Sequence, residues 1–224
     1  MESTSLFPHF SFWPQLTSAQ QTKLLSHTNT QSLPKGSLLH SGNADCMGVL
    51  LVQEGSLRVY LLSEDGREVT LYRLRQGELC MLSASCVLEA ITFDIFIEAE
   101  TPVTISRINA AVFQQIMEEN IYLKAFSYQL IAERFSDVMW RMQQILFLGI
   151  DRRLACFLLE ESASVQSPQI HLTQEQLAKH LGTAREVVSR MLKYFVEENM
   201  VTLFRGGVTI TDEEKLRRLA QPSF

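Results

Sequence analysis

The spacing of apolar residues changes along the chain, and each change marks a different kind of structure. Residues 8–31 predict a short helical lead-in in which Thr17 or Ser18 caps the first turn. Between Gln31 and Ile108 apolar residues recur at about every second position. Beyond Asn109 they recur at helical spacing. The pattern therefore predicts a β-rich N-terminal part followed by a mainly helical part.

The β-rich part predicts several short strands separated by tight turns. Strands are expected at residues 47–53, 57–61, 69–74, 93–99 and 103–108. Turn residues stand between them at 34–36, 41–45, 54–56, 64–67, 76–78 and 101–102. Asp65-Gly66 is a strong hairpin signal, because glycine supplies the positive φ that a tight turn requires. Many short strands with frequent turns favour a small barrel or a jelly-roll-like β-roll, a double-stranded β-helix.

Helices are predicted at residues 110–119, 121–148 and 152–163, and the middle one has apolar residues on two faces. One face carries a seam in alternating steps of four and three, which Lys124 interrupts: Met117, Ile121, Lys124, Tyr128, Ile131, Phe135, Val138, Met142 and Ile145. Apolar residues also lie off this seam, at Leu123, Phe126, Leu130 and Trp140. A helix with two apolar faces can pack on the roll and on a second copy of the chain. We therefore predict a homodimer held by Ile121, Tyr128, Ile131, Phe135, Val138 and Met142. The alternative is a helix packed lengthwise on its own domain.

Residues 172–199 carry the most informative pattern of the helical part. Thr173 followed by Gln176 predicts a capping box at the start of a helix, and Gly182 ends that helix. A second helix is expected from Arg185 to Asn199. A small residue within the first helix and a glycine in the turn allow two helices to cross closely, which is the helix-turn-helix arrangement.

A hairpin follows these two helices and completes a winged helix. Residues 200–204 and 208–211 predict two strands that flank Arg205-Gly206-Gly207. The second helix begins with a polar face, and Arg suits the O6 and N7 atoms of guanine while Glu suits the amino group of cytosine. DNA contacts are expected from Thr173, Gln174, Thr183, Arg185, Glu186, Ser189, Arg190, Lys193 and Arg205. The alternative is a solvated helix start with an internal Arg185–Ser189 or Glu186–Arg190 contact.

Composition and charge exclude several classes of protein. The chain has 224 residues, and its thirteen Phe and mean hydropathy of +0.03 exclude a disordered protein. No apolar run has the length to span a bilayer, and the first residues lack an export signal, so we expect a cytoplasmic protein. The net charge of -5 argues against non-specific coating of nucleic acid. It is uneven, however: residues 151–224 carry 10 Lys/Arg and 10 Asp/Glu, whereas residues 1–150 carry 10 and 15.

Neither a metal site nor an enzyme is indicated. The four cysteines, Cys46, Cys80, Cys86 and Cys156, form no C-x-x-C pair and are expected as reduced thiols. The sequence contains no G-x-S-x-G, P-loop or H-E-x-x-H motif. A cupin-type enzyme would need a His-rich metal motif, and the roll contains only His40.

The stretch from Leu172 to Val201, with Arg185-Glu186-Val187-Val188-Ser189-Arg190, resembles the recognition module of the Crp/Fnr transcription regulators. The resemblance extends upstream to the turn Gln76-Gly77-Glu78, the helix at 121–148 and the join at 151–155. It implies an α+β protein with an effector-sensing, cyclic-nucleotide-binding-like β-roll over 1–119, a dimerisation helix over 120–149 and a winged-helix DNA-binding domain over 150–224. It also implies palindromic double-stranded DNA, a second copy of the chain and RNA polymerase as partners.

The sequence departs from the family in the region that binds cyclic AMP. Family members that bind it continue from their Gly-Glu turn to a second Gly-Glu and an Arg-Ser that grips the phosphate. Here no second Gly-Glu follows Glu78, and no Arg lies between Arg75 and Arg107. A buried phosphate without a guanidinium would lack its bidentate partner, so cyclic AMP is not expected to bind. The family's iron-sulfur branch carries a cysteine cluster near its N-terminus, whereas the first cysteine here is Cys46.

Another effector is therefore expected in the roll. By the resemblance, its pocket would comprise Gly77, Glu78, Leu79, Cys80, Ser83, Ser85 and Cys86. Haem is a candidate cofactor through His9, His27, His40 or Cys80, although none of these stands in a distinctive motif. A redox sensor that uses Cys80 and Cys86 is also compatible with the pattern. The predicted function is a sequence-specific DNA-binding regulator that responds to a small effector or redox signal; the alternative is a ligand-binding regulatory module whose C-terminal helices contact protein.

Overall fold

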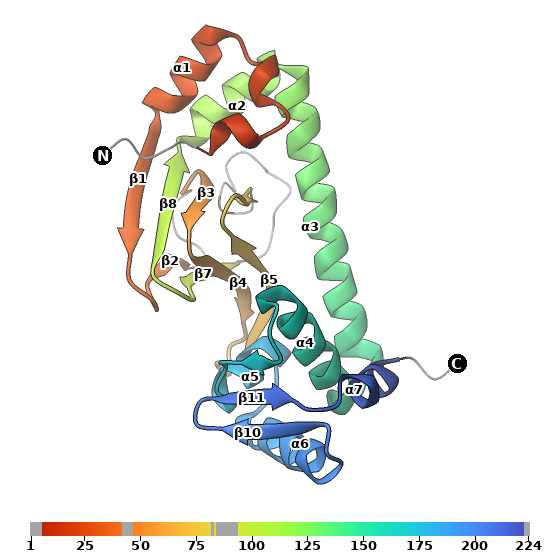
Figure 1. Ribbon diagram of the computed structural model, residues 1–224. Helices are drawn as coiled ribbons and strands as arrows, with labels where there is room; N and C mark the ends of the chain where they lie inside the picture. The colour runs from red at the N-terminus through yellow and green to blue at the C-terminus, as the bar shows by residue number, and fades with distance from the viewer. Residues whose placement is uncertain (1–5, 42–46, 82, 84–93, 222–224) are drawn as a thin grey trace. The chain divides into compact units, whose positions relative to one another are not determined.

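The computed structural model describes residues 6–41, 47–81, 83 and 94–221 (Figure 1). The chain folds as two compact units. The first comprises residues 1–61 and 71–138, and the second comprises residues 62–70 and 139–224. Each unit therefore draws on two separate stretches of sequence, and the tip of one hairpin, residues 62–70, belongs to the second unit.

The first unit contains a β-roll, as the period-two pattern predicts. Its described strands form two four-stranded sheets, in the orders β1-β8-β3-β6 and β2-β7-β4-β5. Figure 1 shows β1, β8 and β3 side by side in the first sheet. The strand bounds are β1 Thr28–Leu33, β2 Leu38–Ser41, β3 Val49–Glu54, β4 Ser56–Leu62, β5 Glu68–Arg75, β6 Leu79–Cys80, β7 Phe96–Ala99 and β8 Val103–Ile108.

The turns between these strands lie where glycine predicts them. Gly66 adopts a φ of 79° in the hairpin between β4 and β5, and Gly77 adopts 85° in the turn before β6. A side chain at either position would strain the backbone, so the glycines determine where the strands reverse. Of the turn predicted at residues 41–45, Ser41 ends β2 and residues 42–45 lie outside the described residues, as does the first residue of the strand predicted at 93–99.

The prediction of a helical lead-in over residues 8–31 is wrong at both ends. Two short 3-10 turns come first, η1 Phe7–His9 and η2 Trp13–Gln15, each with a proline in an early position. They are followed by α1 Ser18–Ser26, which Thr17 caps through a capping box with Gln20. The chain is already extended from Thr28, because β1 pairs with β8 over its whole length. Most of β1 is exposed, so its sequence lacks the alternation that marks a half-buried strand.

Two helices follow the roll with nearly the predicted bounds. They are α2 Ala110–Glu119, capped by the Asn109 side chain, and α3 Ile121–Phe147. Leu123 of α3 is fully buried in a cluster with the N-terminal aromatic residues Phe7 and Phe12, and Phe126 packs against the same cluster. None of the helices in the described part of the chain combines the length and apolar character that crossing a bilayer requires.

The second unit is a winged helix. Its elements are α4 Ile150–Val165, β9 Gln169–Ile170, α5 Gln174–Leu181, α6 Arg185–Glu197, β10 Val201–Phe204, β11 Gly207–Ile210 and α7 Glu213–Ala220. The three strands form a small sheet in the order β10-β11-β9. The pattern of the sequence indicated all of these except β9 and α7. Asp212 caps α7, and its Leu216 is fully buried.

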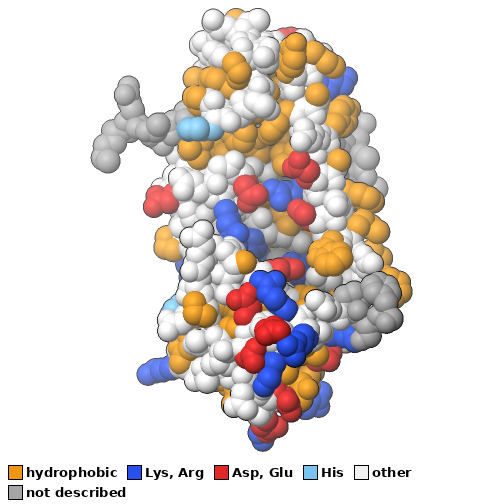
Figure 2. Space-filling model, turned by 45° about the vertical axis from the view of Figure 1, so that its right-hand side comes forward, with side chains coloured by type: hydrophobic (Ala, Val, Ile, Leu, Met, Phe, Trp, Pro, Cys, Tyr) orange, Lys and Arg blue, Asp and Glu red, His pale blue; other side chains and the backbone are white. Residues whose placement is uncertain are grey.

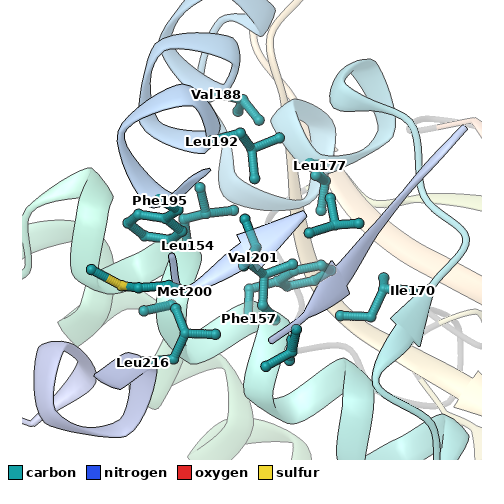
Figure 3. Packing of buried hydrophobic residues seen from close by; sticks show 14 of the residues in the cluster. Leu154, Phe157, Ile170, Leu177, Val188, Leu192, Phe195, Met200, Val201 and Leu216 are labelled. Carbon is teal, nitrogen blue, oxygen red and sulfur yellow. The ribbon is translucent and has the colours of Figure 1, made fainter. Parts of the chain in front are cut away.

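One apolar core holds the second unit together, and Figure 3 shows it from close by. Val188, Leu192 and Phe195 of α6 are fully buried in it. They meet apolar residues from the neighbouring helices and strands, namely Leu154, Phe157, Ile170, Leu177, Met200, Val201 and Leu216. Because one face of α6 is buried in this core, the helix cannot rotate about its axis, and its opposite face points to solvent.

Candidate functional site

The turn between α5 and α6 forms through local signals that the sequence already contains. Thr173 begins α5 with a capping box, in which the amide of Gln176 donates to Thr173 Oγ1 at 3.2 Å and the amide of Thr173 donates to Gln176 Oε1 at 2.9 Å. Gly182 ends α5 in the left-handed conformation, at φ 62° and ψ 44°. The amide of Thr183 then donates to the carbonyl of Ala178 at 3.0 Å. The predicted helix-turn-helix geometry is present.

Gly182 is also constrained by packing within the second unit. A Cβ atom at this position would lie 2.7 Å from Val69 Cγ2, in the hairpin of residues 62–70. The same hairpin contacts α5 through Glu68, whose carboxylate lies 3.1 Å from Lys179 Nζ, and through Thr70, whose hydroxyl lies 3.1 Å from His180 Nδ1. The turn therefore requires glycine both for its backbone angle and for the space beside it.

We expect Gly182→Ala to lower the free energy of unfolding by about 1–2 kcal/mol from its left-handed backbone alone, with a further loss from the clash with Val69. Urea denaturation of the full-length protein measures this loss. Gly206→Ala is the matched control, because Gly206 has a φ of 86° but nothing within 4 Å of an added Cβ. An equal loss in the two variants would show that Val69 imposes no constraint on the turn.

The outward face of α6 carries the residues predicted to read DNA. Arg185, Glu186, Ser189, Arg190 and Lys193 are all exposed. In the described part of the chain, no hydrogen bond or ion pair joins Arg185 to Ser189 or Glu186 to Arg190. The internal contacts that would make this face a solvated helix start are therefore not formed.

The start of α6 adds backbone donors to that face. Its N-cap residue is Ala184, which makes no side-chain cap hydrogen bond. The first amides of the helix are therefore left without the side-chain acceptor that Thr173 provides for α5. The positive end of the helix dipole lies at the same place, and together these features favour a phosphate group.

A groove joins the beginnings of both helices to the wing. It has a volume of about 400 Å³, and its lining comes from α5, α6, β10 and β11: Leu172, Thr173, Gln174, Glu175, Arg185, Leu192, Leu203, Phe204, Gly206, Gly207 and Val208. Thr173, Gln174 and Arg185 of the predicted set thus meet at one surface. Thr183 is half-buried in the turn, and Arg205 is exposed at the wing tip.

The wing contributes apolar residues that sequence reasoning did not select. Leu203 and Phe204 are exposed large side chains at the groove, and the Phe204 ring packs edge-on against His171 at a centroid distance of 5.2 Å. A Cβ on Gly207 would overlap both the Phe204 ring and the carbonyl of Ile170. A tight turn needs only Gly206, which has the positive φ. The additional Gly207 is therefore the signal in the sequence that the Phe204 ring lies against the backbone here.

The exposed apolar face of α3 is displaced from the predicted seam. Ile131 packs against the aromatic cluster of the first unit, and Val138 packs against the interior of the roll. Met117 is buried as well. Eight of the exposed residues follow the same steps of four and three, shifted round the helix: Ile121, Ala125, Tyr128, Ala132, Phe135, Met139, Met142 and Leu146. We call these eight residues the α3 stripe.

In the first unit, the predicted effector turn is tied to α3 by an ion pair. Glu78 Oε2 accepts from the amide of Arg75 at 2.7 Å, and Glu78 Oε1 accepts from Arg134 Nη2 at 3.0 Å. Arg134 also pairs with Asp137 at 3.1 Å. Its guanidinium carbon lies 5.0 Å from the centre of the Tyr72 ring. Neither Arg134 nor Tyr72 was selected from the sequence, because only the packing of α3 on the roll brings them to this turn.

The remaining residues of the predicted pocket are mostly engaged in the fold. Leu79 and Cys80 are buried, and the Ser83 hydroxyl donates to the carbonyls of Gly48 at 2.7 Å and Cys80 at 3.0 Å. Cys80 Sγ lies 3.9 Å from the Tyr72 hydroxyl, and burial raises the pKa of that phenol well above its usual value, so Tyr72 is neutral. Ser85 and Cys86 lie outside the described residues.

The histidines proposed for haem do not come together at one site with Cys80 among the described residues. Nδ1 of His9 lies 3.3 Å from the carbonyl of Leu6, and Nδ1 of His27 lies 2.9 Å from the carbonyl of Lys23. His40 is buried in β2, and burial lowers its pKa. No cluster of three or more metal-ligating side chains occurs in the part of the chain that the structure describes.

Charges elsewhere on the second unit are largely paired. On α7, Arg217 pairs with Glu213 and Arg218 pairs with Glu214. Figure 2 shows acidic and basic side chains interleaved over the lower part of the visible face. The outward face of α6 differs, because Arg185, Arg190 and Lys193 take part in none of the ion pairs among the described residues.

Comparison with known proteins agrees with these features. A model of the Crp-like helix-turn-helix domain matches residues 152–219, and a model of the cyclic nucleotide-binding domain matches residues 30–120. A crystal structure of a Crp/Fnr family regulator from Eubacterium rectale has 43% sequence identity and a TM-score of 0.89, and the match covers 95% of this chain and 99% of that chain.

Two curated relatives match over most of their length. The cAMP-activated global transcriptional regulator CRP of Pasteurella multocida is 27% identical over 186 residues, which is 80% of this chain and 88% of the relative. A probable transcriptional regulator, flp, of Lacticaseibacillus casei is 28% identical over 198 residues, 86% of this chain and 88% of the relative. With an N-terminal domain of the cyclic-nucleotide-binding type, a long helix and a C-terminal winged helix-turn-helix, the chain belongs to the Crp/Fnr family of DNA-binding, non-enzymatic transcriptional regulators.

Proposed function

We propose that this protein binds a palindromic double-stranded DNA site as a homodimer, and that its N-terminal unit adjusts this binding in response to a small effector or redox signal. The observation that carries the DNA contact is the polar face of α6, on which Arg185, Glu186 and Arg190 are exposed and Arg185 lines the groove at the wing. Free guanidinium groups at the start of a rigidly packed helix fit base edges in the major groove. We place this activity in the cytoplasm, as the sequence predicts.

The α3 stripe supports the homodimer. Ile121, Tyr128, Phe135 and Met142 leave 68%, 57%, 65% and 50% of their surfaces exposed. Rows of large apolar side chains in solvent are unfavourable, and a steady four-three spacing is the pattern by which two helices pack together. A symmetric pair of chains covers the stripe and presents two copies of α6 to two half-sites.

Selection from a pool of random duplexes with the full-length protein tests the DNA proposal. We expect enrichment of an inverted repeat whose half-sites lie about 10 base pairs apart, or a multiple of that spacing. Enrichment of a single unrepeated half-site would contradict the dimeric arrangement. The absence of any enriched sequence, from protein that is folded, would favour a module that contacts protein instead.

We propose that the effector is not cyclic AMP, although the Pasteurella multocida relative is named as cAMP-activated. Three arginines of the first unit could have replaced the missing phosphate ligand, and two of them are paired with carboxylates. Arg73 pairs with Glu100 at 3.1 Å, and Arg75 is exposed at the end of β5. Arg134 is held by Glu78 and Asp137. A cyclic phosphate would have to displace a carboxylate to reach either paired guanidinium.

Calorimetry with cyclic AMP and cyclic GMP is expected to show no saturable heat in the micromolar range. The loss of one charge-assisted hydrogen-bond partner costs about 1.5–3 kcal/mol, and the carboxylates add repulsion. The Pasteurella multocida regulator serves as the positive control under the same conditions. Saturable micromolar binding of either nucleotide to the present chain would contradict the proposal.

A further inference from the structure

A second polar cleft lies on the first unit, apart from the turn at Gly77-Glu78. It has a volume of about 420 Å³, within the range of small-molecule sites. Its lining comes from the end of α1, from β1 and β8, from the segment before β3 and from the start of α2: His27, Asn29, Met47, Gly48, Arg107, Asn109, Ala110 and Ala111. It is a separate site, and its chemistry does not depend on the function proposed above.

Among the described residues, the lining of this cleft contains a cation but no carboxylate. The chain as a whole carries a net charge of -5, whereas the described lining residues include Arg107 and neither Asp nor Glu. Arg107 is exposed, and it takes part in none of the side-chain hydrogen bonds or ion pairs among the described residues. Two other arginines on the strands of the roll differ, because Arg58 pairs with Glu98 and Arg73 pairs with Glu100, whereas Arg75 is exposed at the end of β5.

Strand pairing aligns polar groups beside Arg107. Asn29 of β1 stands directly opposite Arg107 of β8 in the antiparallel register. Side chains of directly opposed residues leave the sheet on the same face, with Cβ atoms about 5 Å apart. A guanidinium and an amide NH₂ group are therefore presented together. The Asn29 side chain, like that of Arg107, makes no hydrogen bond within the described part of the chain.

His27 and α2 add further polar groups to the lining. His27 Nδ1 is held by the carbonyl of Lys23 at 2.9 Å and by Ser26 Oγ at 3.1 Å, which fixes the ring and leaves Nε2 as its other polar edge. Asn109 Oδ1 accepts from the amide of Val112 at 3.1 Å. The amides of Ala110 and Ala111, which lie in the lining, are left as donors because the first turn of a helix has no partners for them within the helix.

We propose that this cleft binds a small ligand through a phosphate-type oxyanion. The guanidinium of Arg107 supplies a planar pair of donors that matches two oxygens of such a group. The Asn29 amide supplies a further donor from the neighbouring strand. The cleft is concave, and its described residues include one Arg and no Lys, which suits a compact anion better than an extended acidic surface.

Titration of the full-length, ¹⁵N-labelled protein with inorganic phosphate tests the proposal. We expect saturable shifts in the amide signals of Gly48, Ala110 and Ala111 and in the side-chain NH₂ signals of Asn29. A parallel titration with glycerol 3-phosphate separates the two sources of the oxyanion. Tighter binding of the ester indicates a phosphorylated metabolite, and equal binding indicates free phosphate. Shifts that do not saturate, or that spread evenly over all basic residues, overturn the site.

Two variants make the result specific. Arg107→Gln should weaken phosphate binding at least tenfold, and Asn29→Asp should do the same by placing a carboxylate opposite Arg107. Arg75→Gln is the matched control, because Arg75 is exposed on the same unit but does not line the cleft. Thermal unfolding verifies that each variant is folded. Binding that survives in both Arg107→Gln and Asn29→Asp, or that is lost in Arg75→Gln instead, overturns the proposal.

Discussion

Replacement of Arg190 by alanine should weaken binding to the selected palindrome by about 1–3 kcal/mol per protomer and relax the preference for one base pair in each half-site. Arg190 is exposed and lies on the face of α6 opposite the buried residues Val188 and Leu192. Its guanidinium is therefore available to donate two hydrogen bonds to one guanine, at O6 and N7. Fluorescence anisotropy with the palindrome, and with duplexes changed at single positions, measures both effects.

The design of this experiment separates a base contact from a phosphate contact. Arg218→Ala is the matched control, because Arg218 belongs to the same unit but is paired with Glu214 on α7, and it should leave affinity unchanged. If Arg190→Ala weakens all duplexes equally and reduces the salt dependence, Arg190 contacts phosphate rather than a base. Unchanged affinity and selectivity would show that the outward face of α6 does not read the DNA.

The double substitution Tyr128→Asp and Phe135→Asp should convert the protein to a monomer and abolish tight binding to the palindrome. Both residues belong to the α3 stripe, and symmetric packing would bring four carboxylates together out of water. Burial of unpaired like charges is strongly unfavourable, so the chains should separate. Sedimentation equilibrium gives the mass of the particle, and anisotropy with full and half palindromes gives the loss of cooperative binding.

The control for the dimer experiment adds the same two negative charges to α3, but at positions outside the α3 stripe. Gln129→Asp with Ser136→Asp adds two carboxylates to exposed positions of α3 next to the stripe, and the protein should remain dimeric. Ile131 and Val138 would be poor choices, because they pack on the first unit and their replacement would damage its fold. An undisturbed dimer in Tyr128→Asp with Phe135→Asp would remove the α3 stripe from the interface.

The sequence by itself determined the features that depend on neighbouring residues. Thr173 and Gln176 form the predicted capping box, and Gly182 ends α5 as predicted. The glycine turns of the roll and the wing also lie where they were predicted. These features are local, because a cap or a tight turn is made by residues within a few positions of each other. The outward face of α6 followed in the same way from the helical period.

Tertiary structure decided which face of a helix or strand is covered. The seam predicted on α3 mixed residues that face the roll, such as Ile131 and Val138, with residues that face solvent, such as Tyr128 and Phe135. Both sets have helical spacing, and only the position of the roll distinguishes them. β1 was missed for a related reason, since its pairing with β8 joins Thr28 to Ile108 across a long stretch of sequence.

The same limit applies to the two polar sites of the first unit. Arg134 meets Glu78 and Tyr72 only because α3 packs along the roll. Asn29 meets Arg107 only through the register of β1 with β8. Contacts between residues that are distant in the sequence depend on how strands pair and how helices pack on sheets. The spacing of apolar residues along the chain does not predict either. Local sequence therefore specified the helix that we propose to read DNA, whereas the α3 stripe and the proposed anion cleft emerge only from the folded roll.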